Sequence, residues 1–156
     1  MLSKNAKKEI ELEVAKYPEK RAAVLAALHL AQREHGWISE ETMEEVASLL
    51  DLTPIDVREV TSFYTMFNMR QVGRHHLQVC TNLSCCLLNS RGVVDYLQKK
   101  LGIKVGETTE DQKFTLSTVE CLGSCGTAPM MQIGDDYHEN LTEKKIDKIL
   151  KTLKQM

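Results

Sequence analysis

The chain has 156 residues, a formal net charge of −2 and a hydrophobic fraction of 42%. This length suits one domain or two small ones, and the charge gives no reason to expect a nucleic acid as partner. No apolar run approaches the roughly 20 residues of a membrane span, so we expect no direct membrane insertion. The N-terminus lacks the apolar core of a secretory signal, which favours a cytoplasmic protein, where disulfides are rare.

The first half of the chain, residues 1–72, is predicted to be helical. Apolar residues recur there at helical spacing, and the start and stop signals divide the segment into four helices over 5–16, 19–35, 39–50 and 54–64. Gly36 is well placed to end the second helix and Ser39 to cap the third. Thr53, Pro54 and Asp56 have the residue types of a helix N-terminus. We expect this half to be a helical, partner-docking domain.

The second half, residues 73–156, is predicted to mix strands and helices. We expect strands over 76–80, 113–120 and 130–133, a return strand over 136–139 after the turn at Gly134-Asp135, and helices over 87–101 and 142–154. This order indicates a small sheet covered by helices. The whole chain is therefore assigned to a mixed α/β class, α+β or α/β.

All five cysteines lie in the second half, and four of them form two close pairs. Cys80 and Cys85 are separated by four residues, Cys121 and Cys125 by three, and Cys86 adjoins the first pair. Four thiolates from two loops suit a [2Fe–2S] cluster. Structural zinc is an alternative, although its cysteine pairs more often enclose two residues. Four buried cysteines without a role are the third alternative, and Cys86 is expected to pack as a small apolar group.

The residues around the cysteines suit a charged cluster. Two ferric ions, two sulfides and four thiolates carry a total charge of −2, or −3 after reduction, and this charge needs backbone N–H donors near the sulfurs. The loops 81–84 and 122–124 can supply those donors, and Gly123 and Gly126 allow backbone angles that other residues avoid. A helix that begins near Leu87 would direct its positive end toward the first loop. Water would be excluded by Leu83, Leu122, Met130 and Met131.

The motifs VCTNLSCCLL and VECLGSCGTAPMMQIGDDYHENLT resemble the thioredoxin-like [2Fe–2S] ferredoxin family, and within it the NuoE-type subunits of respiratory complex I. The upstream segment TSFYTMFNMRQVGRHHLQVC is similar as well. The resemblance implies an N-terminal helical bundle before a thioredoxin-like ferredoxin domain. It also implies that Cys80, Cys85, Cys121 and Cys125 bind the cluster, and it suggests a cis peptide bond before Pro129.

The same resemblance implies a one-electron carrier in the NADH dehydrogenase module of complex I, an enzyme component without a substrate site of its own. FMN and NADH are then expected on a NuoF-type flavoprotein partner, beside a neighbouring iron–sulfur subunit, on the cytoplasmic side of the inner membrane. An equivalent subunit of an NAD-linked hydrogenase or formate dehydrogenase is an alternative. A zinc-stabilised assembly module is another. The sequence contains no dinucleotide fingerprint or P-loop, and it favours no nucleic-acid role.

Residues 63–69 form a dense run of aromatic and methionine side chains. Core packing is expected to account for most of it. A share of these side chains is expected at a partner interface, where aromatic residues and methionine are enriched.

Overall fold

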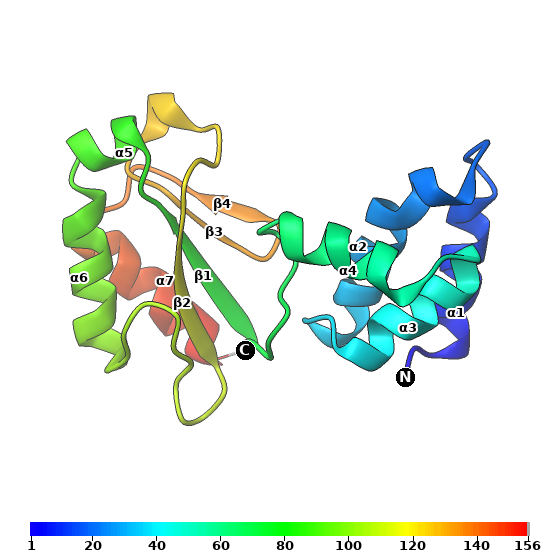
Figure 1. Cartoon of the computed structure of the whole chain (residues 1–156). Helices are drawn as coiled ribbons and strands as arrows, with labels where there is room; N and C mark the ends of the chain where they lie inside the picture. Colours follow the sequence, from blue (N-terminus) through cyan, green and yellow to red (C-terminus); the bar gives the residue numbers. More distant parts are fainter. Residues whose placement is uncertain (156) are drawn as a thin grey trace. The chain divides into compact units, whose positions relative to one another are not determined.

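The computed structural model describes residues 1–155, which form two compact units. The first unit spans Met1–Gln71 and the second begins at Val72. Figure 1 shows the first as a group of helices and the second as a sheet with helices. Within the described residues, no helix is both long enough and apolar enough to cross a membrane.

Five helical segments build the first unit. They are α1 (Lys4–Val14), the 3₁₀ helix η1 (Lys20–Ala23), α2 (Val24–His35), α3 (Glu40–Leu50) and α4 (Pro54–Phe63). Each contributes buried side chains to one core, among them Ile10, Ala23, Leu28, Val46 and Val57. The predicted helical half is confirmed, with one difference: the segment 19–35 begins as a 3₁₀ turn before α2.

The helix boundaries of this unit follow the predicted signals. Gly36 adopts the left-handed conformation after α2, with φ of 76°, and its N–H donates to Gln32 O at 2.7 Å. The Ser39 hydroxyl accepts from Thr42 N at 3.2 Å and caps α3. Thr53 and Asp56 form a reciprocal capping box ahead of α4, in which Asp56 Oδ2 accepts from Thr53 N at 3.1 Å. These contacts satisfy backbone groups that a helix end leaves unpaired.

The second unit contains a four-stranded sheet. Its elements are β1 (His75–Cys80), α5 (Leu83–Leu87), α6 (Ser90–Leu101), β2 (Phe114–Val119), the 3₁₀ turn η2 (Cys125–Thr127), β3 (Met131–Ile133), β4 (Asp136–His138) and α7 (Glu143–Gln155). The strand order is β2-β1-β3-β4. The β1–β2 pair is parallel, whereas β3 is antiparallel to both β1 and β4. The predicted sheet and the return strand after Gly134-Asp135 are confirmed.

Helices α6 and α7 lie on the same face of this sheet (Figure 1). The core between them is made by alternate strand residues, because side chains at every second position share a face. Leu77 and Leu116 contribute from the two parallel strands and Met131 from β3, and they pack with helix residues such as Leu97 and Ile146. The sheet is thereby held as a rigid platform, with the cysteine loops at the end of β1 and β2.

The predicted helix over 87–101 is wrong in one respect, because it is two helices. Asn89 interrupts the segment in the left-handed conformation, with φ of 70°, and its Oδ1 accepts from Gly92 N at 3.3 Å to cap α6. A Cβ at position 92 would lie 2.5 Å from the Asn89 amide nitrogen, so glycine makes room for this cap. The short helix α5 therefore precedes the break, and Cys85 lies inside it.

Candidate metal centre

The parallel pairing of β1 and β2 places the two cysteine loops at one end of the sheet. Cys80 is the register partner of Val119, and Thr81 N–H donates to Val119 O at 2.9 Å. Since parallel strands end on the same edge, the chain leaves both strands side by side. Cys121 follows two residues after Val119. Figure 1 shows α5 and the yellow segment near residue 120 at the same upper end of the second unit.

Cys80 and Cys85 are buried together. Cys80 is 4% exposed and Cys85 2% exposed, and both belong to a small apolar cluster with Ala128 and Met130. The Cys80 N–H donates to Met130 O at 3.1 Å, which ties the first cysteine to the segment that follows the second loop. The Cys80 thiol donates to Glu120 O at 3.7 Å, a normal distance for sulfur. These contacts hold the first pair against residues from the second loop.

The burial of this pair changes the acidity of Cys85. Burial raises the pKa of the Cys85 thiol to about 11, and its contact with the Cys80 thiol raises the pKa further. The Met130 backbone acts in the opposite direction, and Cys125 lies near enough to contribute to the increase. Without a cation, the buried pair therefore keeps its protons at neutral pH. Iron binding must displace them, as it does wherever thiolate ligands coordinate a metal.

Cys121 and Cys125 lie on the solvent-exposed side of the site. Gly123 N–H donates to Cys121 Sγ at 3.4 Å, so this loop does supply a backbone donor to a cysteine sulfur. Gly123 adopts φ of 77°, as its predicted role requires. Gly126 does not adopt a positive φ, so the same expectation for Gly126 is wrong. The η2 turn, which begins at Cys125, sets the backbone there instead.

The four predicted ligands are all free thiols at one end of the sheet. Cys80, Cys85 and Cys125 are near one another, whereas Cys121 lies on the exposed loop. Within residues 1–155, no three histidine, cysteine, aspartate or glutamate side chains converge closely enough to ligate one ion. The fit to an iron–sulfur cluster thus rests on the all-thiol donor set, on its placement and on the Gly123 donor. All three suit that group.

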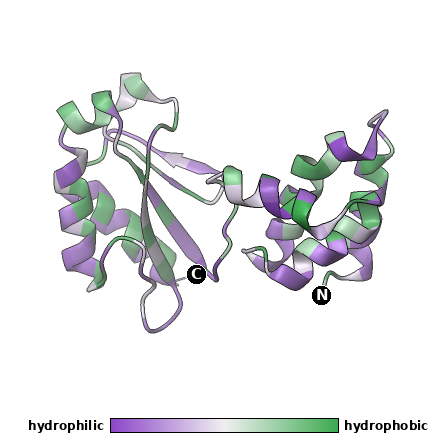
Figure 2. Ribbon diagram, viewed as in Figure 1, coloured by the Kyte–Doolittle hydropathy of each residue, from purple (hydrophilic) through white to green (hydrophobic). Residues whose placement is uncertain are grey.

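Two expectations about the shell of the site need correction. Leu83 is 70% exposed and does not exclude water from the cysteines. The buried shell consists of Met130 and Ala128, with Leu122 partly buried beside them. Helix α5 begins at Leu83, where the Asn82 side chain accepts from Leu83 N at 2.7 Å, and not near Leu87. Figure 2 shows α5 coloured mostly as hydrophobic, so an apolar surface borders the site.

The predicted cis peptide bond before Pro129 is confirmed. Cys86 is half-buried beside Cys85. A polar network next to Cys125, made by Ser124, Thr127 and Glu139, was not foreseen. The hydroxyls of Ser124 and Thr127 both donate to the Glu139 carboxylate and hold the pKa of that carboxyl below its usual value. No sequence signal links these residues, because Glu139 follows Ser124 by fifteen positions.

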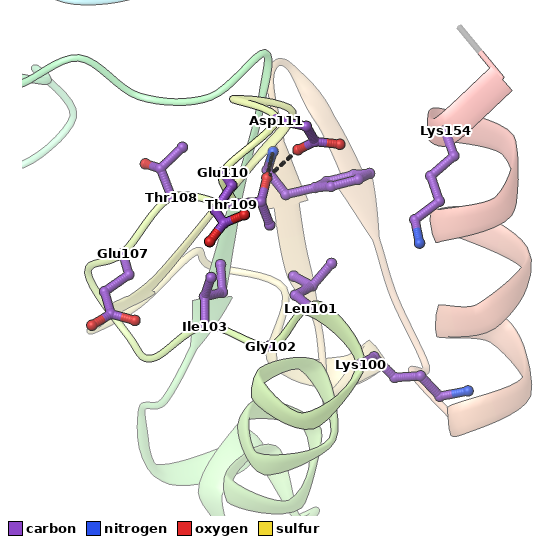
Figure 3. A pocket seen from close by; sticks show the side chains of 11 residues that line it. Lys100, Leu101, Gly102, Ile103, Glu107, Thr108, Thr109, Glu110, Asp111 and Lys154 are labelled. Atoms are coloured by element: carbon purple, nitrogen blue, oxygen red, sulfur yellow. Dashed lines mark hydrogen bonds between the residues drawn. The ribbon is translucent and has the colours of Figure 1, made fainter.

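A separate hollow of about 540 Å³ lies where β2 begins, at the end of that strand away from Cys121. Figure 3 shows Lys100 and Lys154 on one side and the carboxylates of Glu107, Glu110 and Asp111 on the other. The Thr109 hydroxyl donates to Asp111 Oδ1 at 2.6 Å within this loop. No cysteine lines the hollow, so it is not part of the candidate metal centre.

The family model for thioredoxin-like [2Fe–2S] ferredoxins matches residues 10–154. The chain belongs to this family. Its predicted fold, a helical segment followed by a thioredoxin-like ferredoxin domain, is confirmed, and so is the predicted [2Fe–2S] cofactor. Zinc is thereby set aside as the resident metal.

Several members of this ferredoxin family are similar to the chain over most of its length. An E-type subunit of NADH-quinone oxidoreductase from Rhizobium meliloti (strain 1021), the one numbered 2, is 47% identical over 148 residues, which are 95% of this chain and 88% of the relative. The E-type subunit of NADH-quinone oxidoreductase from Rickettsia felis (strain ATCC VR-1525 / URRWXCal2) is 50% identical over 140 residues, which are 88% and 84% of the two chains. The predicted resemblance to this type of subunit is confirmed.

A solved structure of an NAD⁺-reducing [NiFe]-hydrogenase in the H₂-reduced state shares the fold of this ferredoxin-family chain. The match covers 85% of the chain with a TM-score of 0.75 and 20% sequence identity. It spans only 22% of the hydrogenase chain. At this identity the similarity establishes the fold alone.

Proposed function

We propose that the chain is a one-electron carrier subunit whose cluster is held by Cys80, Cys85, Cys121 and Cys125. The observation that carries the proposal is the placement of both cysteine pairs at one end of the sheet by the parallel β1–β2 register. When bound, a [2Fe–2S] cluster accepts and returns one electron at a time. A family-wide cofactor and four free thiols at that end support the assignment of these ligands.

The protein's own residues have distinct tasks in this proposal. Cys80 and Cys85 hold the buried side of the cluster, where Met130 and Ala128 limit access of water. Cys121 and Cys125 hold its exposed side, where an electron can be exchanged with a partner. Gly123 donates its N–H to sulfur and thereby offsets negative charge on the ligand. The asymmetry of burial directs electron exchange toward the exposed loop.

The partner that we propose is a flavoprotein of the NuoF type, which carries FMN and the NADH site, next to a further iron–sulfur subunit. The chain would then belong to the NADH dehydrogenase module of complex I, on the cytoplasmic side of the inner membrane. This proposal is supported by relatives at 47–50% identity that are named as E-type subunits of NADH-quinone oxidoreductase. An equivalent place in an NAD-linked hydrogenase or formate dehydrogenase is the second candidate, supported only by the shared hydrogenase fold.

The helical unit is proposed as the partner-docking domain, and the exposed end of α4 supports this role. Phe63 is 77% exposed, and Tyr64 and Met66 are 39% and 40% exposed. Within the run 63–69, Phe67 alone is fully in the core and Met69 packs partly against it, which corrects the expectation that core packing explains most of the run. Phe63 and Tyr64 contact each other edge to face, with ring centroids 5.1 Å apart. Exposed aromatic pairs of this kind are typical anchors at protein interfaces.

Affinity purification of the tagged chain from its own cells tests the proposal. We expect a flavin-containing subunit to co-purify, and NADH to produce the EPR signal of the reduced cluster in that complex. The isolated chain should give no such signal with NADH and the full signal with dithionite. A complex that reduces quinone supports complex I, whereas hydrogenase or formate dehydrogenase activity supports the second candidate. Purification without any flavoprotein would contradict the proposed partner.

A further inference from the structure

The loop that carries Cys121 and Cys125 is exposed, yet the segment 137–141 holds it at several points. The Tyr137 hydroxyl donates to Leu122 O at 2.8 Å. Asn140 N–H donates to Thr127 O at 2.7 Å, and Leu141 N–H donates to Pro129 O at 2.9 Å. Because the two cysteines of this loop are exposed, burial cannot fix their positions. The hydrogen bonds from β4 and the residues after it must do so.

Glu139 is at the centre of this set of contacts. Its Oε1 accepts from Thr127 Oγ1 at 2.6 Å and also from Ser124 Oγ, while the two hydroxyl oxygens lie 2.7 Å apart. The two hydroxyls have two protons for these three oxygens, and a charged carboxylate is the strongest acceptor among them. Ser124 immediately precedes Cys125, and Thr127 follows it by two residues. One carboxylate therefore grips both sides of a cysteine.

We infer that Glu139 is a positioning residue for the [2Fe–2S] cluster, which it serves by bracing the turn that carries Cys125. The inference rests on the proposed ligand role of Cys125. All three side chains of the brace, Ser124, Thr127 and Glu139, are half-buried. Glu139 is also anchored at its own backbone, where Lys145 Nζ donates to Glu139 O. The brace thus connects the cysteine loop to the start of α7.

The brace has two separable consequences. It restricts the Cys125 backbone, so its loss should make the cluster easier to extract. It also places a negative charge close to a group that becomes more negative on reduction, and this disfavours reduction. Removal of the charge alone should therefore raise the reduction potential, while removal of one hydroxyl should loosen the loop and leave the charge in place.

Three variants separate these effects. Glu139→Gln keeps the shape and one acceptor oxygen but removes the charge. Thr127→Val keeps the shape of the threonine and removes one donor. Asp136→Asn is the matched control, since Asp136 is an exposed carboxylate on β4 and lies three residues before Glu139, next to the Gly134 turn. Far-UV circular dichroism checks that each purified variant is folded.

Iron release to a chelator and the EPR-monitored reduction potential are then measured for the cluster-containing protein. We expect Glu139→Gln and Thr127→Val each to accelerate iron release by about fivefold or more, with Asp136→Asn close to the wild type. Only Glu139→Gln should shift the potential clearly to more positive values. Wild-type behaviour of both brace variants would overturn the inference and leave the proposed function intact. If Glu139→Gln does not fold, Thr127→Val decides alone. A wild-type protein without any cluster would overturn the proposed function itself, and the inference with it.

Discussion

Cys80 and Val119 end their strands as register partners in the parallel β1–β2 pair. This pairing brings together the two cysteine loops, because the chain continues from Cys80 into the loop before Cys85 and from Val119 toward Cys121. The buried pair and the exposed pair therefore belong to one end of the sheet, although 35 residues separate them in the sequence. The ligand set that we propose follows from this register.

The first prediction concerns which of two adjacent cysteines is a ligand. We expect Cys85→Ser to abolish the cluster and Cys86→Ser to retain it, because Cys85 is buried against Cys80 whereas Cys86 is only half-buried. Iron content and visible absorption of the two purified variants measure this. Retention of the cluster by Cys85→Ser, together with its loss in Cys86→Ser, would exchange the two roles.

The second prediction concerns the backbone of the exposed loop. Gly123→Ala forces a side chain into the left-handed region, which costs about 1–2 kcal/mol, although nothing lies within 4 Å of the added Cβ. A domain of this size should then melt roughly 4–8 °C lower for each kcal/mol. Gly126→Ala is the control, since its Cβ also meets open space and its backbone needs no such angle. Equal shifts of the two melting temperatures in calorimetry would show that backbone strain is not the cause.

A third prediction concerns the acid sensitivity of the helical unit. Hydrogen bonds from Thr53 and Arg21 hold the pKa of the Asp56 carboxyl below its ordinary value of 3.8. A lowered pKa stabilises the fold above the unfolded value, and this stabilisation is lost as the pH falls through the folded value. Asp56→Asn should therefore flatten the decline in thermal stability between about pH 5 and pH 2.5. Melting curves followed by circular dichroism at several pH values measure it, and an unchanged decline would contradict the role of Asp56.

The fourth prediction tests the proposed docking role of the helical unit. Phe63→Ser should leave the melting temperature nearly unchanged, because the ring is 77% exposed, and should weaken binding of the flavoprotein about tenfold or more. Leu12→Ser is the control, as Leu12 is a 61% exposed apolar residue on α1. The amount of flavin that co-purifies with each tagged variant measures binding. Equal losses for both variants would indicate a non-specific surface effect.

Much of the fold could be predicted from local signals in the sequence. Gly36, Ser39, Thr53 and the Gly134 turn act through contacts within a few residues, so their types identify the boundaries. The break at Asn89 was missed because apolar periodicity continues across it. Its signal is the pair of Asn89 and Gly92, whose meaning depends on a left-handed angle that residue types alone do not reveal.

The candidate site was predictable in its ligands but not in its support. The spacing of Cys80, Cys85, Cys121 and Cys125 is a local property of the sequence. The register that brings the loops together depends on packing against α6 and α7, and the Glu139 brace joins residues twelve and fifteen positions apart through side-chain hydrogen bonds. Long-range contacts of this kind leave no periodic pattern, so they emerge only from the folded structure.

The presence of a [2Fe–2S] cluster on this chain is best decided by EPR of the anaerobically purified wild-type protein before and after dithionite. We expect no signal in the oxidised protein, a rhombic signal near g = 2 after reduction that integrates to about one spin per chain, and about two iron atoms per chain. A colourless protein that gives no signal and retains one zinc ion per chain would contradict the cluster.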